Sequence, residues 1–159
     1  LIIQKTVELG ITKIVPVEMI RCVVKLDEKK KNAKVSRWQA IAESAAKQSK
    51  RTVIPEVFDA MSFKQAISKA SELDMFIVPY ECKNGMEATV DALKKIKGSK
   101  SIGIIIGPEG GFEDSEIDLA ISAGGIAVSL GKRILRTETA AITAVAMCML
   151  HIEMNTDGE

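Results

Sequence analysis

Continuous apolar segments separated by amphipathic helical segments are the feature that most limits how this chain can fold. Residues 74–78 (DMFIV), 101–106 (SIGIII) and 126–130 (IAVSL) show no in–out alternation of apolar and polar side chains. Strands of that kind are buried on both faces. Helical periodicity at 86–97 and 114–123 separates them, which is typical of parallel strands joined by helices. The sequence therefore predicts an α/β fold, with a parallel sheet and helices on both faces.

The remaining elements follow from local signals. Ser62 to Gln65 reads as a capping box, which predicts a helix with Phe63, Ala66, Ile67 and Ala70 on one face. The other predictions are helices at 1–9, 35–50 and 137–151, strands at 13–17 and 53–58, and a charged surface loop at 27–34.

Size and composition favour a single globular domain. The chain has 159 residues, 47% apolar and 27% charged, and no apolar run approaches the ~20 residues that cross a bilayer. Three cysteines without a CxxC pair favour reduced thiols and a cytoplasmic location, and disfavour a disulfide framework or a metal site. Because the first residue, Leu1, already lies in a helical pattern, we expect the chain to be a fragment of a longer protein.

Charge is unevenly distributed. Residues 25–51 carry nine Lys or Arg against three acids, a net charge of +6, whereas the rest of the chain carries about −5. A basic face can attract phosphates, although a solvated surface explains the same pattern equally well.

Each of the three late strands ends in an unusual loop. These loops are residues 78–81 (VPYE), 107–112 (GPEGGF) and 129–139 (SLGKRILRTET). In a parallel sheet all three lie at the carboxyl edge, where such sheets bind ligands. We therefore expect one site built from three loops.

The second loop is suited to main-chain recognition. Its glycines allow the backbone close to a ligand, and it matches neither the Walker nor the GxGxxG phosphate pattern. The helix behind it opens with Glu113, Asp114 and Glu116, which would repel a phosphate. A neutral or cationic small molecule fits better, and a tight turn with nothing bound is the alternative.

The third loop combines cations with apolar residues. Lys132, Arg133 and Arg136 surround Ile134 and Leu135, which we expect to fold inward and pin the loop. The alternative is a basic surface loop with one buried apolar plug.

Together, "IGIIIGPEGGFEDSE" and "AVSLGKRILRTETAAITA" resemble the RsmE-type methyltransferases of the SPOUT (trefoil-knot) superfamily. "QKTVELGITKIVPV" and "RWQAIAESAAKQSKRTVIPEV" extend the resemblance over nearly the whole chain. These enzymes use S-adenosylmethionine to methylate N3 of a uridine in small-subunit (16S) ribosomal RNA.

The resemblance implies a SPOUT fold with a C-terminal deep trefoil knot, and a homodimer with cofactor sites near the subunit contact. The last helix, 137–151, suits such an interface, although burial in the chain's own core explains it equally well. Residues 1–159 would form the catalytic domain, without the family's N-terminal RNA-binding β-barrel, and no membrane partner is implied. The implied cofactor-binding residues are Pro79, Tyr80, Glu81, Gly107, Pro108, Glu109, Gly110, Gly111, Ser129, Leu130, Gly131, Ile134, Leu135, Thr137 and Thr139.

The same resemblance suggests catalytic roles. A cation beside O2 or O4 would stabilise the uridinate formed when N3 loses its proton, with Arg136 the first candidate and Arg133 the second. Glu138 or Glu109 could accept the proton, although helix-terminal and loop-building roles explain both carboxylates as well.

RNA-binding residues are implied as well. They are Arg21, which we expect to face the RNA rather than the cofactor, together with Lys50 and Arg51.

Two other functions stay open. A related knotted enzyme could methylate the ribose 2′-hydroxyl or another base, although Gly131 stands where such relatives carry Asn. The chain could also be an RNA-binding remnant without turnover, which failure to bind S-adenosylmethionine would indicate.

Overall fold

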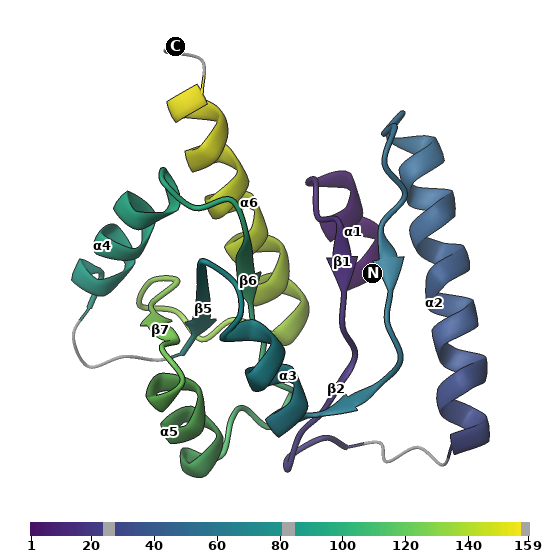
Figure 1. The fold of residues 1–159 in the computed structure, drawn as a ribbon, viewed down its shortest axis with the longest axis horizontal. Coiled ribbons are helices and arrows are strands. Elements are labelled where there is room, and N and C mark those ends of the chain that lie inside the picture. The colour runs from purple at the N-terminus through teal and green to yellow at the C-terminus, as the bar shows by residue number, and fades with distance from the viewer. Residues whose placement is uncertain (24–27, 81–84, 157–159) are drawn as a thin grey trace.

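The computed structural model describes residues 1–23, 28–80 and 85–156, without the side chains of residues 28, 29 and 156. Its helices and strands alternate along the chain (Figure 1). They are α1 (Ile2–Glu8), β1 (Lys13–Ile14), β2 (Val17–Glu18), α2 (Glu28–Gln48), β3 (Glu56–Val57), β4 (Met61–Ser62), α3 (Phe63–Ala70), β5 (Met75–Pro79), α4 (Glu87–Ile96), β6 (Ile102–Ile104), α5 (Asp114–Ser122), β7 (Ile126–Val128) and α6 (Thr137–Thr156). None of these helices is both long and apolar enough to cross a bilayer.

A three-stranded parallel sheet forms the centre of the C-terminal half. Its order is β6-β5-β7, so the middle strand, β5, pairs through Ile77 with Ile104 on one side and Ile126 on the other. All four residues from Met75 to Val78 are buried, as their unbroken apolar run requires. The predicted parallel sheet is confirmed.

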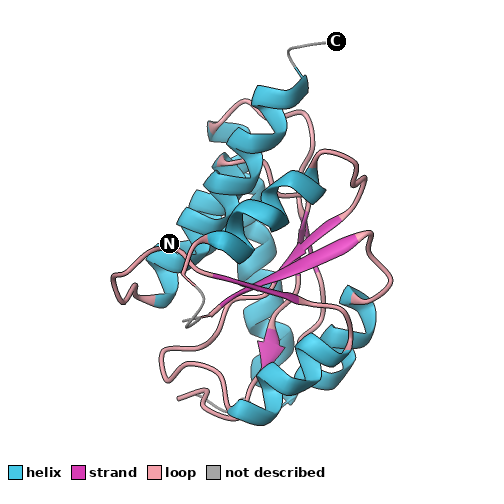
Figure 2. Cartoon of the chain, turned by 90° about the vertical axis from the view of Figure 1, so that its left-hand side faces the viewer, coloured by secondary structure: helices cyan, strands magenta, loops and turns pink. Residues whose placement is uncertain are grey.

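Helices cover both faces of this sheet (Figure 2). Phe76 and Val78 belong to a cluster with residues of α3 and α5, whereas Met75 and Ile77 belong to a cluster with residues of α4 and α6. Successive side chains of a strand point to opposite faces, so one buried strand supplies both cores. The predicted α/β class with two helical layers is confirmed.

The N-terminal half is built from shorter pairs. β1 pairs with β3 and β2 with β4, both parallel, and each strand has two residues. The strand predicted at 13–17 is interrupted before Pro16, which cannot donate to a ladder and instead accepts a bond from Met61 N at 3.0 Å.

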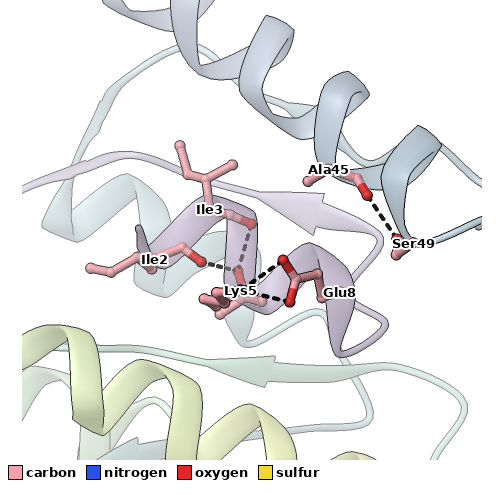
Figure 3. Close-up of polar contacts among 7 residues, drawn as sticks. Ile2, Ile3, Lys5, Glu8, Ala45 and Ser49 are labelled. Carbon is pink, nitrogen blue, oxygen red and sulfur yellow. Dashed lines mark hydrogen bonds and ion pairs between the residues drawn. The ribbon is translucent and has the colours of Figure 1, made fainter.

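The first two helices pack beside these pairs (Figure 1). Val7 of α1 and Ala42, Ala45 and Ala46 of α2 are buried together, since alanines let the two helix backbones approach closely. Figure 3 shows how polar groups at this contact are satisfied locally: Lys5 pairs with Glu8 at 2.9 Å. Ser49 Oγ likewise donates to the Ala45 carbonyl at 2.8 Å.

Helix ends were only partly predictable. The capping box of α3 is confirmed, since Gln65 N donates to Ser62 Oγ and Ser62 N donates to Gln65 Oε1. The charged loop predicted at 27–34 is wrong for 28–34, where α2 is already helical. Lysine and glutamate are good helix formers, so a charged run is as compatible with a helix as with a loop.

Candidate functional site

The loops after β5, β6 and β7 meet in one cleft of about 340 Å³. This volume falls within the range of small-molecule sites. Most of the predicted cofactor-binding residues line it: Pro79, Tyr80, Gly107, Pro108, Gly111, Ser129, Leu130, Gly131, Ile134, Leu135 and Thr137. Glu109, Gly110 and Thr139 do not line the cleft, and Glu81 lies outside the described residues. The structure thus brings the three loops together.

Glycines shape the second loop in different ways. Gly111 has φ +72° and donates to the Pro108 carbonyl at 2.8 Å, which closes a tight turn. A Cβ on Gly107 would lie 2.9 Å from the Phe112 ring, and one on Gly110 would lie 2.9 Å from Arg21 Cβ. The loop therefore needs glycine for backbone conformation at one position and for close packing at two.

The third loop is fixed to the neighbouring helix α4. The buried Thr89 hydroxyl donates to the Ser129 carbonyl and accepts from Ser129 N, both at 2.9 Å. Gly131, at φ +106°, donates to Ser129 Oγ at 3.2 Å. Because Thr89 satisfies both main-chain groups of Ser129, the start of this loop is held firmly.

An aromatic row forms the floor beneath the second loop. Tyr80, which lines the cleft, meets the Phe112 ring edge-on at 6.3 Å between centroids, and Phe112 meets Phe63 in the same way at 6.3 Å. Phe112 is buried and belongs to the core cluster of α3 and α5. The loop is therefore anchored to the hydrophobic core by a side chain the sequence analysis did not assign.

The predicted catalytic residues are only partly brought together. Arg133 and Arg136 are both exposed, but only Arg133 lines the cleft, and Glu138 is half-buried outside the lining. The inward folding predicted for Ile134 is wrong: its side chain is 92% exposed on the cleft rim, while Leu135 is half-buried. No described neighbour covers Ile134, so the loop is held by Leu135 and its backbone bonds instead.

Arg21 lines the cleft, although the sequence analysis expected it to face away from the cofactor. Its Nε pairs with Glu113 Oε1 at 2.9 Å, and a terminal nitrogen donates to the Gly110 carbonyl at 3.2 Å. The hydrogen bond between Arg21 and Glu113 lowers the pKa of the Glu113 carboxyl and raises the pKa of Arg21. Arg21 therefore connects the glycine-rich loop to α5.

A buried carboxylate, Glu116, also connects the segment next to Arg21 to the start of α5. Glu116 is 4% exposed, and its two oxygens accept bonds from Ile20 N and Glu113 N, each at 2.9 Å. It thus joins segments almost a hundred residues apart in sequence. In the sequence, Glu116 indicates only repulsion toward phosphate, and its contact with Ile20 N is visible only in the folded chain.

The other two predicted RNA-binding residues lie at the end of α2. Arg51 donates to the carbonyls of Val7, Gly10 and Ile11 at 2.9, 3.0 and 2.7 Å, which satisfies the end of α1. Lys50 is exposed at φ 57°. The structure thus gives Arg51 a role in holding α1, which spacing alone could not indicate.

A second hollow, of about 460 Å³, is lined by residues that include Ile20, Glu116, Phe63, Lys64 and Leu119. None of the predicted site residues lies there. Within the described ranges, no group of three or more His, Cys, Asp or Glu side chains is placed to hold a metal ion.

Comparison with known proteins assigns the chain to a family. Residues 1–149 match the family model described as "RNA methyltransferase domain". The chain is 39% identical, over 158 residues, to the "Ribosomal RNA small subunit methyltransferase E" of Bacillus subtilis (strain 168), covering 96% of this chain and 61% of that one. It is 36% identical, over 148 residues, to the protein of that name from Mesomycoplasma hyopneumoniae (strain 232), covering 92% and 62%.

Solved structures of methyltransferases are also similar to this chain. A putative methyltransferase from Legionella pneumophila, "in complex with the bound cofactor SAM", has a TM-score of 0.85 at 34% identity, with 94% of this chain and 59% of that one covered. A "Ribosomal RNA small subunit methyltransferase E" from Neisseria gonorrhoeae, "bound to S-adenosyl methionine", has a TM-score of 0.78 at 37% identity, covering 93% and 58%. The chain spans about three fifths of the length of these relatives.

Proposed function

Because the chain belongs to the RNA methyltransferase domain family, we propose that it transfers a methyl group from S-adenosylmethionine to N3 of a uridine in small-subunit (16S) ribosomal RNA. The names of the relatives support the RNA substrate, and the titles of two structural neighbours support the methyl donor. The preference for N3 of uridine rests on the resemblance of the two C-terminal sequence motifs to the RsmE type.

The observation that carries the proposal is the composition of the cleft. Its lining includes three glycines, Gly107, Gly111 and Gly131, together with Tyr80 and Asp114. Such a site offers N–H and C=O groups at short range, whereas the carboxylates of α5 disfavour a polyphosphate. S-adenosylmethionine carries a cationic sulfonium and no phosphate, and these residues fit it.

When bound, the donor supplies an electrophilic methyl group. The chain must then place the uracil N3 in line with that methyl group, and orientation alone can lower a barrier by ~7–11 kcal/mol in favourable cases. Arg133 lines the cleft, and Arg136 follows it in the same loop. We assign to them the stabilisation of negative charge on the uracil oxygens, with Arg133 now ahead of Arg136 because of its position.

The proton on N3 needs an acceptor. Our candidates are Glu138 in the first turn of α6 and Glu109 in the glycine-rich loop, neither of which lines the cleft. Because neither lines the cleft, we assign the proton transfer to one of them through a water molecule. The target uridine has to be unpaired or flipped, because base pairing hides N3.

The assembly proposals follow from the same family. We assign residues 1–159 to the catalytic domain, with a C-terminal trefoil knot, although knots are rare among folds. Buried Ala144 and Cys148 show that one side of α6 packs in the chain's own core, while Leu150 and Met154 are 53% and 72% exposed. These exposed apolar residues support a homodimer contact, and the ribosomal substrate supports a cytoplasmic location.

Methyl mapping tests the function directly. The chain is incubated with isotopically labelled S-adenosylmethionine and small-subunit ribosomal RNA, and the digested nucleosides are separated and identified by mass spectrometry. We expect label in 3-methyluridine. Label in a 2′-O-methyl nucleoside would assign the chain to a different reaction, and absence of both label and cofactor binding would indicate a remnant without turnover.

A further inference from the structure

We propose that the outward face of α2 binds the phosphate backbone of a double-helical segment of the RNA substrate, at a distance from the methylation cleft. This surface, called here the basic face, consists of Ala33, Arg37, Ala40, Ser44 and Lys47. The inference rests on the proposed function, because that function supplies the RNA substrate. In Figure 1, α2 forms one flank of the molecule and the sheet that carries the cleft lies toward the other.

The inward face of α2 fixes which side is outward. Ala42, Ala45 and Ala46 are buried with Val7 and Val57 in the N-terminal core. All five residues of the basic face are exposed, as the periodicity of the helix requires.

The arrangement of the basic face suits a backbone rather than a pocket. At about 100° per residue, Arg37 and Lys47 lie about 80° apart around the helix, and Ala40 and Ser44 lie between them. Along the axis the two cations are separated by about 15 Å. Small side chains in the middle let the helix approach a surface closely, and a cation on either side can then reach a phosphate.

Charge supports a nucleic acid over a second copy of the chain. Glu43 is the one carboxylate in the sequence from 30 to 48, and it is half-buried, off the basic face, and accepts a bond from Gln39 at 3.4 Å. Two copies placed face to face would bring like charges together with no acid between them. A polyanion faces no such repulsion.

The residue types favour a duplex over a single strand. Proteins bind single strands largely by stacking bases on aromatic side chains. The basic face has none, and the nearby Trp38 packs against the N-terminal core. Double-stranded RNA is recognised mainly by its shape and its phosphate and ribose contacts, which a rigid helix with spaced cations can supply.

The test compares two pairs of substitutions of equal charge. Arg37→Ala with Lys47→Ala removes the cations of the basic face. Lys95→Ala with Lys97→Ala removes two exposed cations at the end of α4, on the opposite flank. Binding of a 20-base-pair RNA duplex is measured by fluorescence anisotropy from 50 to 300 mM salt, and folding is checked by thermal unfolding.

We expect the first pair to weaken duplex binding about tenfold at 0.1 M salt and to reduce the slope of log affinity against log salt by about 1.8, the value for two lost phosphate contacts. We expect the control pair to change neither quantity. Equal losses in both pairs, or no loss in the first, would overturn the proposal. The same two substitutions can also be tested for binding of polyglutamate. If they weaken binding of polyglutamate and leave duplex binding unchanged, the basic face binds an acidic protein instead.

A parallel calorimetric titration with S-adenosylhomocysteine separates this proposal from the proposed function. Both pairs should bind it as the unsubstituted chain does, since neither touches the cleft. Unchanged duplex binding together with normal cofactor binding would remove the basic face and leave the methyltransferase assignment standing. Failure of the unsubstituted chain to bind S-adenosylhomocysteine would instead count against that assignment.

Discussion

The two halves of this molecule depend on different properties of their residues: backbone conformation in the C-terminal half and side-chain charge in the N-terminal half. Around the sheet β6-β5-β7, the candidate site depends on backbone shape, which is set by glycines and by a few buried side chains that hold three loops in place. Around α1 and α2, alanines and one arginine build the core, and the function we assign lies in side-chain charge on a helix surface. A cleft whose loops depend on glycine is sensitive to one added methyl group, whereas a charged face responds gradually to the loss of single charges.

The largest expected effect comes from filling the glycine-rich loop. Gly110→Val adds carbon where Arg21 Cβ would be only 2.9 Å away, so the loop has to move. We expect S-adenosylhomocysteine affinity measured by calorimetry to fall by at least about 100-fold, since backbone groups displaced from the ligand lose their hydrogen bonds. Gly98→Val is the control, because a Cβ there meets nothing within 4 Å; unchanged affinity in Gly110→Val would refute the loop assignment.

Removing the cleft cation should affect chemistry more than binding. We expect Arg133→Ala to reduce single-turnover methyl transfer by about 10²-fold or more, the cost of one lost electrostatic donor, with cofactor affinity nearly unchanged. Arg136→Ala, at an exposed position outside the lining, should cost less. The reverse order would restore Arg136 as the leading candidate, and full activity in both variants would exclude this loop from charge stabilisation.

Glu116→Gln tests the contact that joins Ile20 to the start of α5. One of the two backbone N–H groups would face an amide N–H instead of a carboxylate oxygen, which costs about 1.5–3 kcal/mol for a lost bond to a charged group. Urea unfolding should show that loss. The exposed Glu72→Gln is its control, and equal stabilities of the two variants would show that the tie contributes little.

Low pH should reduce the stability of the folded chain through two carboxylates, one near each end of the sheet. Glu113 beside Arg21, and Asp74, whose carboxylate accepts bonds from Lys100 N at 2.6 Å and Ser101 N at 2.9 Å, have lowered pKa values in the folded chain. Their contribution is therefore present above the ordinary pKa of these carboxyls and is lost as pH falls through the lower folded pKa. Urea unfolding from pH 6 to pH 3 should show a smaller acid loss for Asp74→Asn than for the parent, and identical profiles would contradict this.

The smallest expected effect concerns the chemical reactivity of the Cys148 thiol. Burial raises the pKa of the Cys148 thiol to about 11, so little of the nucleophilic thiolate forms at neutral pH. Mass spectrometry after iodoacetamide treatment at pH 7.5 should find Cys148 unmodified in the folded chain and modified after unfolding in urea. Rapid modification of the folded chain would show that α6 opens readily from the sheet.

Much of the C-terminal half could be predicted from sequence because its signals are local. Unbroken apolar runs such as Met75 to Val78 identify buried parallel strands, and the convergence of their loops follows from topology. The exposure of Ile134 could not be predicted, since an apolar residue in a loop can face a core or an open cleft with the same sequence.

The contacts that hold the site were harder to predict because they join distant segments. Nothing near Glu116 in sequence indicates that Ile20 N will be its partner, and nothing near Arg51 indicates the carbonyls at the end of α1. The helical start of α2 was missed for another reason: a lysine-rich stretch is compatible with both a solvated loop and a solvated helix.

A crystal structure of the chain grown with saturating S-adenosylhomocysteine addresses the proposed site directly. We predict ligand density in the cleft between Tyr80, the loop of Gly107 and Gly111, and the loop of Ser129 and Gly131, with main-chain N–H and C=O groups as its nearest polar partners. Density in the hollow beside Leu119, or none in the cleft despite saturation, would contradict the account.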